Sequence, residues 1–209
     1  QLIKSTASTT TASVESVHRA AGDAVVEEYT LLNVLPRDVA DAHVAGAIHL
    51  DNLGGWILKP REIMHDLRFF LKNGITQTRH TATLGFSKLP KNLETALAAT
   101  LGMLKMASGE VGGEQTVDFF NLFLASYTKN LSSEEIREKL RLFLYSLNQS
   151  QPVQVSLGLE LVVPEFLREC SVASGEGRYR DFEEESRRLA MILLELILEE
   201  SKEKPVFNP

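Results

Sequence analysis

Apolar residues recur with a helical period along most of the chain, which predicts a mainly helical protein. Proline residues, capping residues and glycine residues mark where these periodic stretches begin and end. Ser132-Ser-Glu-Glu135 has the form of a capping box at a helix start. We expect helices over residues 14–35, 36–45, 60–73, 91–108, 114–127, 132–147, 165–170 and 181–200.

Strict alternation of apolar and polar residues predicts a strand over residues 153–163, the clearest strand signal in the sequence. One side carries Val and Leu, whereas the other carries small or polar residues, which suit either a cavity lining or a surface. A weaker alternation predicts a short strand over residues 81–86. The polar side of the first strand consists of Gln154, Ser156, Gly158 and Glu160.

The segment from Leu35 to Asp51 combines a short helix with an extended exit. Gly46 can end the helix in the left-handed conformation. After it, His49 and Asp51 are separated by one residue, so both would leave an extended strand on the same side. The segment is therefore a candidate site that joins a buried histidine to a carboxylate.

A glycine-rich corner, Ser108 to Gly113, separates the helices predicted over residues 91–108 and 114–127. Together these form a predicted helical hairpin over residues 91–127, with a slim alanine-rich face that permits close helix packing. Free N–H groups at the second helix start are a candidate anion cradle, although most such corners only turn the chain. This cradle would consist of Gly112, Gly113, Glu114 and Gln115.

Other polar residues are weaker candidates. His43, His49 and Asp51 form a possible metal-ligand set for a hydrolase, but no spacing holds His43 on the face of His49. Cys170 follows Glu169, whose carboxylate disfavours a reactive thiolate, so we predict a bystander thiol. Around Gly54 and Gly55 we expect a tight turn with Trp56 covering the core, in preference to a ligand site.

Composition limits the classes of function. The 209 residues are 44% hydrophobic and 24% charged, as in ordinary globular proteins, and the net charge of −6 argues against nucleic acid as a partner. No apolar run is long enough for a membrane span, and one cysteine excludes an intrachain disulfide framework. We expect an extended lead-in over residues 1–12, one domain over residues 13–209 and a cytoplasmic location. Because the chain starts at Gln1, we expect it to be a piece of a longer polypeptide.

Several stretches, in order and at the expected spacing, resemble the anaerobic (class III, glycyl-radical) ribonucleoside-triphosphate reductases. The resemblance covers nearly the whole chain. It is carried by Leu35–Asp51, Trp56–Pro60 with His65–Phe70, Gly112–Gln115 with Asp118–Asn121, Val163–Leu167 and Lys204–Pro209.

The resemblance implies an α+β, mainly helical fold that forms the N-terminal part of a glycyl-radical-enzyme β/α barrel. In that family a glycyl radical generates a cysteine thiyl radical that abstracts hydrogen from ribose. Nucleoside triphosphates would be substrates or effectors, bound near His49, Asp51 and Gly112–Gln115. The resemblance also implies a homodimer formed through the 91–127 hairpin.

The sequence departs from the family in ways that bear on catalysis. His49-Leu-Asp-Asn-Leu-Gly54 replaces a common His-x-His-Asp-Leu-Asp pattern, and no cysteine lies near residues 50–75. The radical glycine, the thiyl cysteine and a four-cysteine zinc site should lie beyond Pro209, and a radical-generating activase would serve only a complete parent. We therefore expect a fragment or degenerate relative that is not catalytic alone and holds no catalytic residue, metal or cofactor of its own. The alternative is a non-catalytic helical self-association module.

Overall fold

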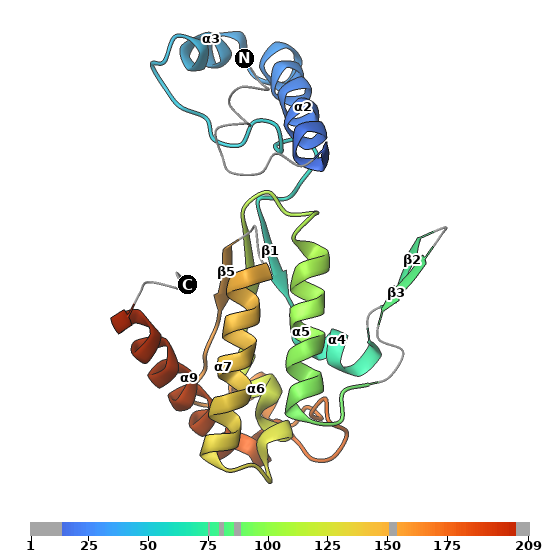
Figure 1. The fold of residues 1–209 in the computed structure, drawn as a ribbon, viewed down its shortest axis with the longest axis vertical. Helices are drawn as coiled ribbons and strands as arrows, with labels where there is room; N and C mark the ends of the chain where they lie inside the picture. Colours follow the sequence, from blue (N-terminus) through green and yellow to red (C-terminus); the bar gives the residue numbers. More distant parts are fainter. Residues whose placement is uncertain (1–13, 75, 80–81, 86–88, 151–153, 204–209) are drawn as a thin grey trace. The chain divides into compact units, whose positions relative to one another are not determined.

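The computed structural model describes residues 14–74, 76–79, 82–85, 89–150 and 154–203 (Figure 1). By its internal contacts the chain divides into an N-terminal unit, residues 1–61, and a C-terminal unit, residues 62–209. The predicted lead-in over residues 1–12 and the family-like stretch Lys204–Pro209 lie outside the described residues. The single domain expected over residues 13–209 stays a prediction, because a division by contacts does not show whether the two units unfold together.

The N-terminal unit begins with the predicted long helix, which changes its hydrogen-bonding pattern near its end. The α-helix gives way to a π-helical turn, and a short helix follows after Pro36. Thr30 at this change is fully buried and donates its hydroxyl hydrogen to the Val26 carbonyl oxygen at 2.7 Å. These elements are α2 (Val14–Tyr29), η1 (Thr30–Val34) and α3 (Arg37–Val44).

The predicted core face of α2 is wrong in this unit. Val14, Val25 and Leu32, which the helical period assigned to the core, are all more than half exposed. The buried apolar side chains of the described part of the unit are Ala40 and Leu53. An amphipathic stripe is buried only where a second layer lies against it, and the described residues of this unit form no layer over that side of α2.

Helix α3 ends as its sequence predicts. Gly46 has φ +76°, the Gly46 N–H donates to the His43 carbonyl, and the Ala47 N–H donates to the Ala42 carbonyl. This pair of bonds is a Schellman motif, which satisfies the last carbonyl groups of the helix. The expected extended strand over 48–51 is wrong, because no other strand in the described chain pairs with this segment.

Gly54 lies where the turn after Asp51 approaches α2. A Cβ atom at Gly54 would lie 2.8 Å from both the Cβ and the carbonyl oxygen of Asp23, so only glycine fits. The predicted tight turn is therefore present. Trp56 does not cover the core, since it is 46% exposed and its Nε1 donates to the Asp51 carbonyl at 3.0 Å.

The C-terminal unit is built on a three-stranded parallel sheet in the order β1-β4-β5. Its helices α5 (Leu93–Ala107) and α7 (Ser133–Ser150) lie side by side (Figure 1), and the α5 carbonyl of Leu104 accepts a hydrogen bond from Gln115 on β4. Helices therefore cover one face of the sheet. The strands are β1 (Glu62–His65), β4 (Glu114–Val117) and β5 (Gln154–Leu157).

Two helix predictions are wrong at the places where the chain enters this sheet. Residues 62–65 form β1, so the helix expected from Pro60 starts only at Leu67, and residues 114–117 form β4. The helical hairpin predicted over 91–127 therefore does not exist: α5 is followed by a strand. Strand pairing on both sides of β4 outweighs the local helical pattern, which is a tertiary effect.

The connections between the strands are helical, with one antiparallel hairpin. The strand predicted over 81–86 is present over residues 82–85, where it pairs with residues 76–79. Between β1 and β4 lie α4 (Leu67–Asn73), β2 (Thr76–Arg79), β3 (Ala82–Gly85) and α5 (Leu93–Ala107); between β4 and β5 lie α6 (Phe120–Leu124), η2 (Ala125–Thr128) and α7 (Ser133–Ser150).

The helix predictions over the C-terminal half are confirmed. The capping box forms, with the Ser132 N–H donating to the Glu135 carboxylate at 2.8 Å. Arg137 pairs with Glu195 and Glu199, which joins α7 to the last helix. The helical period over residues 132–147 predicts five inward positions, and all are buried: Ile136, Leu140, Phe143, Leu144 and Leu147. The remaining elements are α8 (Glu165–Arg168), η3 (Tyr179–Phe182) and α9 (Glu183–Glu203).

Strand β5 is shorter than the alternation predicted. After Leu157 the chain bends at Gly158, whose N–H donates to the Val117 carbonyl and whose carbonyl accepts from the Phe120 N–H. Beyond this bend, the backbone bonds to a side chain and not to a neighbouring strand: the Glu160 N–H donates to Oδ1 of the buried Asn121 at 2.9 Å. The α+β, mainly helical prediction is confirmed in this form: helices with a small parallel sheet.

Candidate functional site

The face of the sheet that the helices leave uncovered is the candidate site. Along each strand, alternate side chains point to opposite faces. One set is mostly buried, whereas every member of the other is half-buried or exposed. Met64 in the second set is 71% exposed. We call this second set the open face: Glu62, Met64, Glu114, Thr116, Gln154 and Ser156.

The open face is polar and acidic. Glu62, Glu114 and Gln154 are register partners, so they form one row across the three strands. Ser156 donates its hydroxyl hydrogen to the Glu114 carboxylate, which joins β5 to β4. This face therefore offers mainly hydrogen-bond acceptors together with small hydroxyl groups.

The carboxyl ends of β1, β4 and β5 meet at one edge, where Asp66, Asp118 and Gly158 follow the strands. The described structure gives the half-buried Asp118 no hydrogen bond or ion pair. A Cβ atom at Gly158 would lie 2.8 Å from Asp118 Oδ1, so this carboxylate lies on the same side as Ser156. Phe119 has φ +54°, a left-handed conformation that is unfavourable for a bulky residue.

The neighbouring carboxylate of Asp66 is fully engaged. It caps α4 by accepting from the Arg68 N–H, and it forms a two-point ion pair with the Arg68 guanidinium at 3.0 and 2.8 Å. The Arg68 hydrogen bond is the largest cause that lowers the pKa of Asp66, ahead of burial, which raises it. Asp66 is therefore a structural carboxylate, in contrast to Asp118.

On the covered face, His65 and Gln115 form a buried polar pair, 2.9 Å apart between Nε2 and Oε1. The Gln115 Nε2 group donates to the Leu104 carbonyl at 3.1 Å, so its Oε1 accepts and His65 Nε2 donates. Burial lowers the pKa of His65, while the bond to Gln115 raises it. The sequence had placed His65 on a helix; it ends β1 instead.

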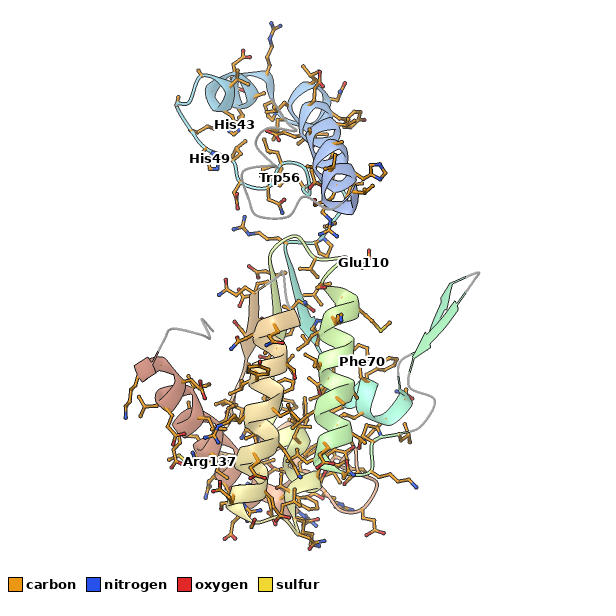
Figure 2. The ribbon with its side chains drawn as sticks, in the orientation of Figure 1. His43, His49, Trp56, Phe70, Glu110 and Arg137 are labelled. Atoms are coloured by element: carbon orange, nitrogen blue, oxygen red, sulfur yellow. The ribbon has the colours of Figure 1, made fainter. Side chains whose placement is uncertain are left out.

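Of the predicted site residues in the N-terminal unit, His49 and Asp51 are both exposed, so the buried histidine expected here is wrong. Figure 2 labels His49 and, on α3, His43. The rings of His43 and His49 do meet, with centroids 5.7 Å apart. However, His43 Nδ1 accepts the Leu50 N–H at 3.1 Å, so Nε2 of the neutral ring carries the hydrogen and cannot ligate a metal. In the described chain no group of three or more metal-ligating side chains is assembled.

The predicted cradle at Gly112, Gly113, Glu114 and Gln115 loses its physical basis, because a strand and not a helix begins at Glu114. Gln115 is fully buried on the covered face, while Glu114 belongs to the open face. Cys170 is exposed. The assignment of these glycine residues, Glu114 and Gln115 to a nucleotide site stays a prediction.

Comparison with known proteins decides the family. Residues 6–209 match the family model described as anaerobic ribonucleoside-triphosphate reductase. The chain belongs to this family. No curated protein sequence matches the chain.

Solved structures of anaerobic ribonucleotide reductases have the same fold at low sequence identity. Three from Thermotoga maritima are each 16% identical: one with dATP bound in the specificity site, one with citrate in the active site and one in complex with dATP and CTP. Their TM-scores are 0.71, 0.70 and 0.68, and they match 95%, 99% and 89% of this chain. The chain spans only 38%, 40% and 34% of their length.

In this member of the reductase family, the sequence predicted part of the open face but not its carboxyl edge. The alternation over 153–163 identified Ser156 and Gly158 as a set that could line a cavity. Asp118 was assigned to a helix, because nothing local distinguishes a strand at residues 114–117. The sequence signal that could have pointed to Asp118 was the resemblance of Asp118–Asn121 to a stretch of the reductase family.

No helix in the described ranges is both long enough and apolar enough to cross a membrane. This finding agrees with the absence of a long apolar run in the sequence.

Proposed function

We propose that this chain forms the N-terminal part of the catalytic barrel of an anaerobic ribonucleoside-triphosphate reductase. It would supply barrel wall and part of a nucleotide site, and it would not be catalytic alone. Family membership supports the reaction class, in which a ribonucleotide is converted to a deoxyribonucleotide by radical chemistry.

The observation that carries the proposal is the uncovered polar face of an all-parallel sheet. Parallel sheets are ordinarily covered on both faces. Among the described residues, α5 and α7 cover one face only, and Glu114, Thr116 and Ser156 on the other are polar. A barrel wall has this asymmetry, since helices cover its outside and its other side chains face the barrel interior.

Nucleoside triphosphates are the partners that we propose, as substrates or effectors. Structures with the same fold are described with dATP in a specificity site and with CTP. The glycyl radical, the thiyl cysteine, the zinc site and the activating enzyme belong to a complete parent in this proposal, which would act in the cytoplasm.

A homodimer is also proposed, but not through the hairpin first expected. We place the dimer contact at α5, because a groove of about 490 Å³ lies between α5 and α7 and could receive a second copy of the chain. Leu97, Ala98, Leu101 and Leu142 provide its apolar walls.

Thermal unfolding of the purified chain tests the nucleotide proposal. Each ribonucleoside and deoxyribonucleoside triphosphate is added in turn, and at least one should raise the melting temperature, because a ligand that binds only the folded state stabilises it. Light scattering at several concentrations should give a dimer. A monomer whose melting temperature responds to no nucleotide would contradict the proposal.

The second candidate function is a non-catalytic self-association module. It is favoured by the outer face of α7, where Leu142 and Tyr145 are 65% and 61% exposed between two apolar grooves. In that case Leu142→Glu would abolish the dimer, whereas no nucleotide would change the melting temperature. A melting temperature that rises with added nucleotide would favour the reductase proposal over the self-association module.

A further inference from the structure

We propose that Asp118 is a substrate-positioning residue that accepts hydrogen bonds from the ribose hydroxyl groups of the nucleotide. The inference rests on the proposed function and assigns one residue of the open face to one part of the substrate.

Asp118 lies at the carboxyl edge of the parallel sheet. It follows β4, the central strand, at the carboxyl end, and ligands of parallel α/β sheets bind outside the carboxyl ends of the strands. At the same edge, Asp66 holds Arg68 with both carboxylate oxygens. Asp118, although half-buried, has no such partner in the described chain. Of these two carboxylates, Asp118 is thus the one with its acceptor capacity unused.

The backbone around Asp118 fixes where this carboxylate points. Gly158 on the adjacent strand leaves the space that Asp118 Oδ1 occupies, since a Cβ atom there would lie only 2.8 Å away. The Gly158 N–H and carbonyl both bond to the chain on either side of Asp118, at Val117 and Phe120. The left-handed Phe119 turns the chain into α6 directly afterwards. The side chain is therefore held beside Ser156 on the open face.

The charge of the open face selects which part of a nucleotide can lie there. Glu62 and Glu114 share this face with Asp118, so the face repels a triphosphate. Sugar hydroxyl groups are donors, and a carboxylate can accept from two adjacent ones with its two oxygens. Hydrogen bonds to a charged acceptor are stronger than neutral ones. The ribose, and not the phosphates, is the part that fits.

The test measures binding of all four ribonucleoside triphosphates and their 2′-deoxy counterparts by calorimetry. Asp118→Asn should weaken ribonucleotide binding by at least about tenfold, since it removes a charge-assisted bond, and should weaken 2′-deoxynucleotide binding less. Gly158→Ala, which displaces the carboxylate, should act in the same direction. Glu165→Gln, a change at a fully accessible carboxylate on α8, serves as the control and should leave binding unchanged.

The outcomes separate this inference from the proposed function. A variant with ribonucleotide affinity equal to that of the unchanged chain overturns the role of Asp118 and leaves the proposed function intact. An equal loss of affinity for ribonucleotides and 2′-deoxynucleotides also overturns this role, because the loss would then not depend on the 2′-hydroxyl group. If the unchanged chain binds no nucleotide, the proposed function fails and the inference fails with it. Melting temperatures show whether each variant is folded; if Gly158→Ala unfolds, Asp118→Asn decides.

Discussion

His65 at the end of β1 donates a hydrogen bond to Gln115 on β4, and Gln115 in turn donates to the α5 carbonyl of Leu104. One chain of side-chain bonds therefore joins two strands and a helix across the covered face of the sheet. Burial disfavours the charged form of the His65 ring and so lowers its pKa, although the bond to Gln115 opposes this.

This relationship predicts how stability depends on pH. Burial lowers the pKa of His65 below 6.5, so the unfolded chain binds a proton before the folded chain does. The stabilisation is fully present above pH 6.5 and is lost as the pH falls from 6.5 through the folded pKa. Urea unfolding between pH 7.5 and 5 should therefore give a falling free energy of unfolding.

The variant His65→Gln removes the titrating ring and should flatten this part of the pH profile, although it lowers stability at neutral pH. His18→Gln, at an exposed position on α2, is the matched control and should keep the slope. An unchanged slope in His65→Gln would show that other groups cause the dependence.

Tyr179 carries a hydroxyl group that is buried without a hydrogen-bond partner in the described chain. An unpaired buried hydroxyl costs free energy, so Tyr179→Phe should raise the free energy of unfolding by about 1 kcal/mol. Tyr145→Phe, on the exposed face of α7, should have no effect. Chemical denaturation at pH 7 measures both, and a loss of stability in Tyr179→Phe would mean that its hydroxyl is bonded.

The same burial makes the C-terminal unit sensitive to alkali. Burial raises the pKa of Tyr127 to about 12 and raises that of Tyr179 as well. Above pH 10 the unfolded chain therefore loses these protons first, and stability falls as the pH rises toward 12. The double variant Tyr127→Phe with Tyr179→Phe should remove most of this fall.

Gly54 predicts a local steric effect in the N-terminal unit. Gly54→Ala would bring a methyl group 2.8 Å from the Asp23 backbone, so we expect a loss of about 1–3 kcal/mol. Gly22→Ala on α2 has nothing within 4 Å and should instead raise stability by about 0.5–1 kcal/mol. Denaturation followed by circular dichroism compares them, and equal effects would contradict the close approach at Gly54.

The sequence by itself determined the elements whose signals are local. The capping box at Ser132, the glycine stop at Gly46 and the inward positions of α7 were predicted, because caps and helical period depend on residues within a few positions of each other. Family membership was predicted as well, from stretches spread along the chain.

Only the tertiary structure decided that residues 62–65 and 114–117 are strands. A strand in the middle of a parallel sheet is stabilised by partners far away in sequence: Gln115 lies beside Ile63 and Val155. The local sequence pattern contains no information about those partners, so the helical period around β4 predicted a helix in place of the strand. The same pairing separates Glu114 from Gln115 onto opposite faces and places Asp118 beside Gly158, which no spacing along one segment could reveal.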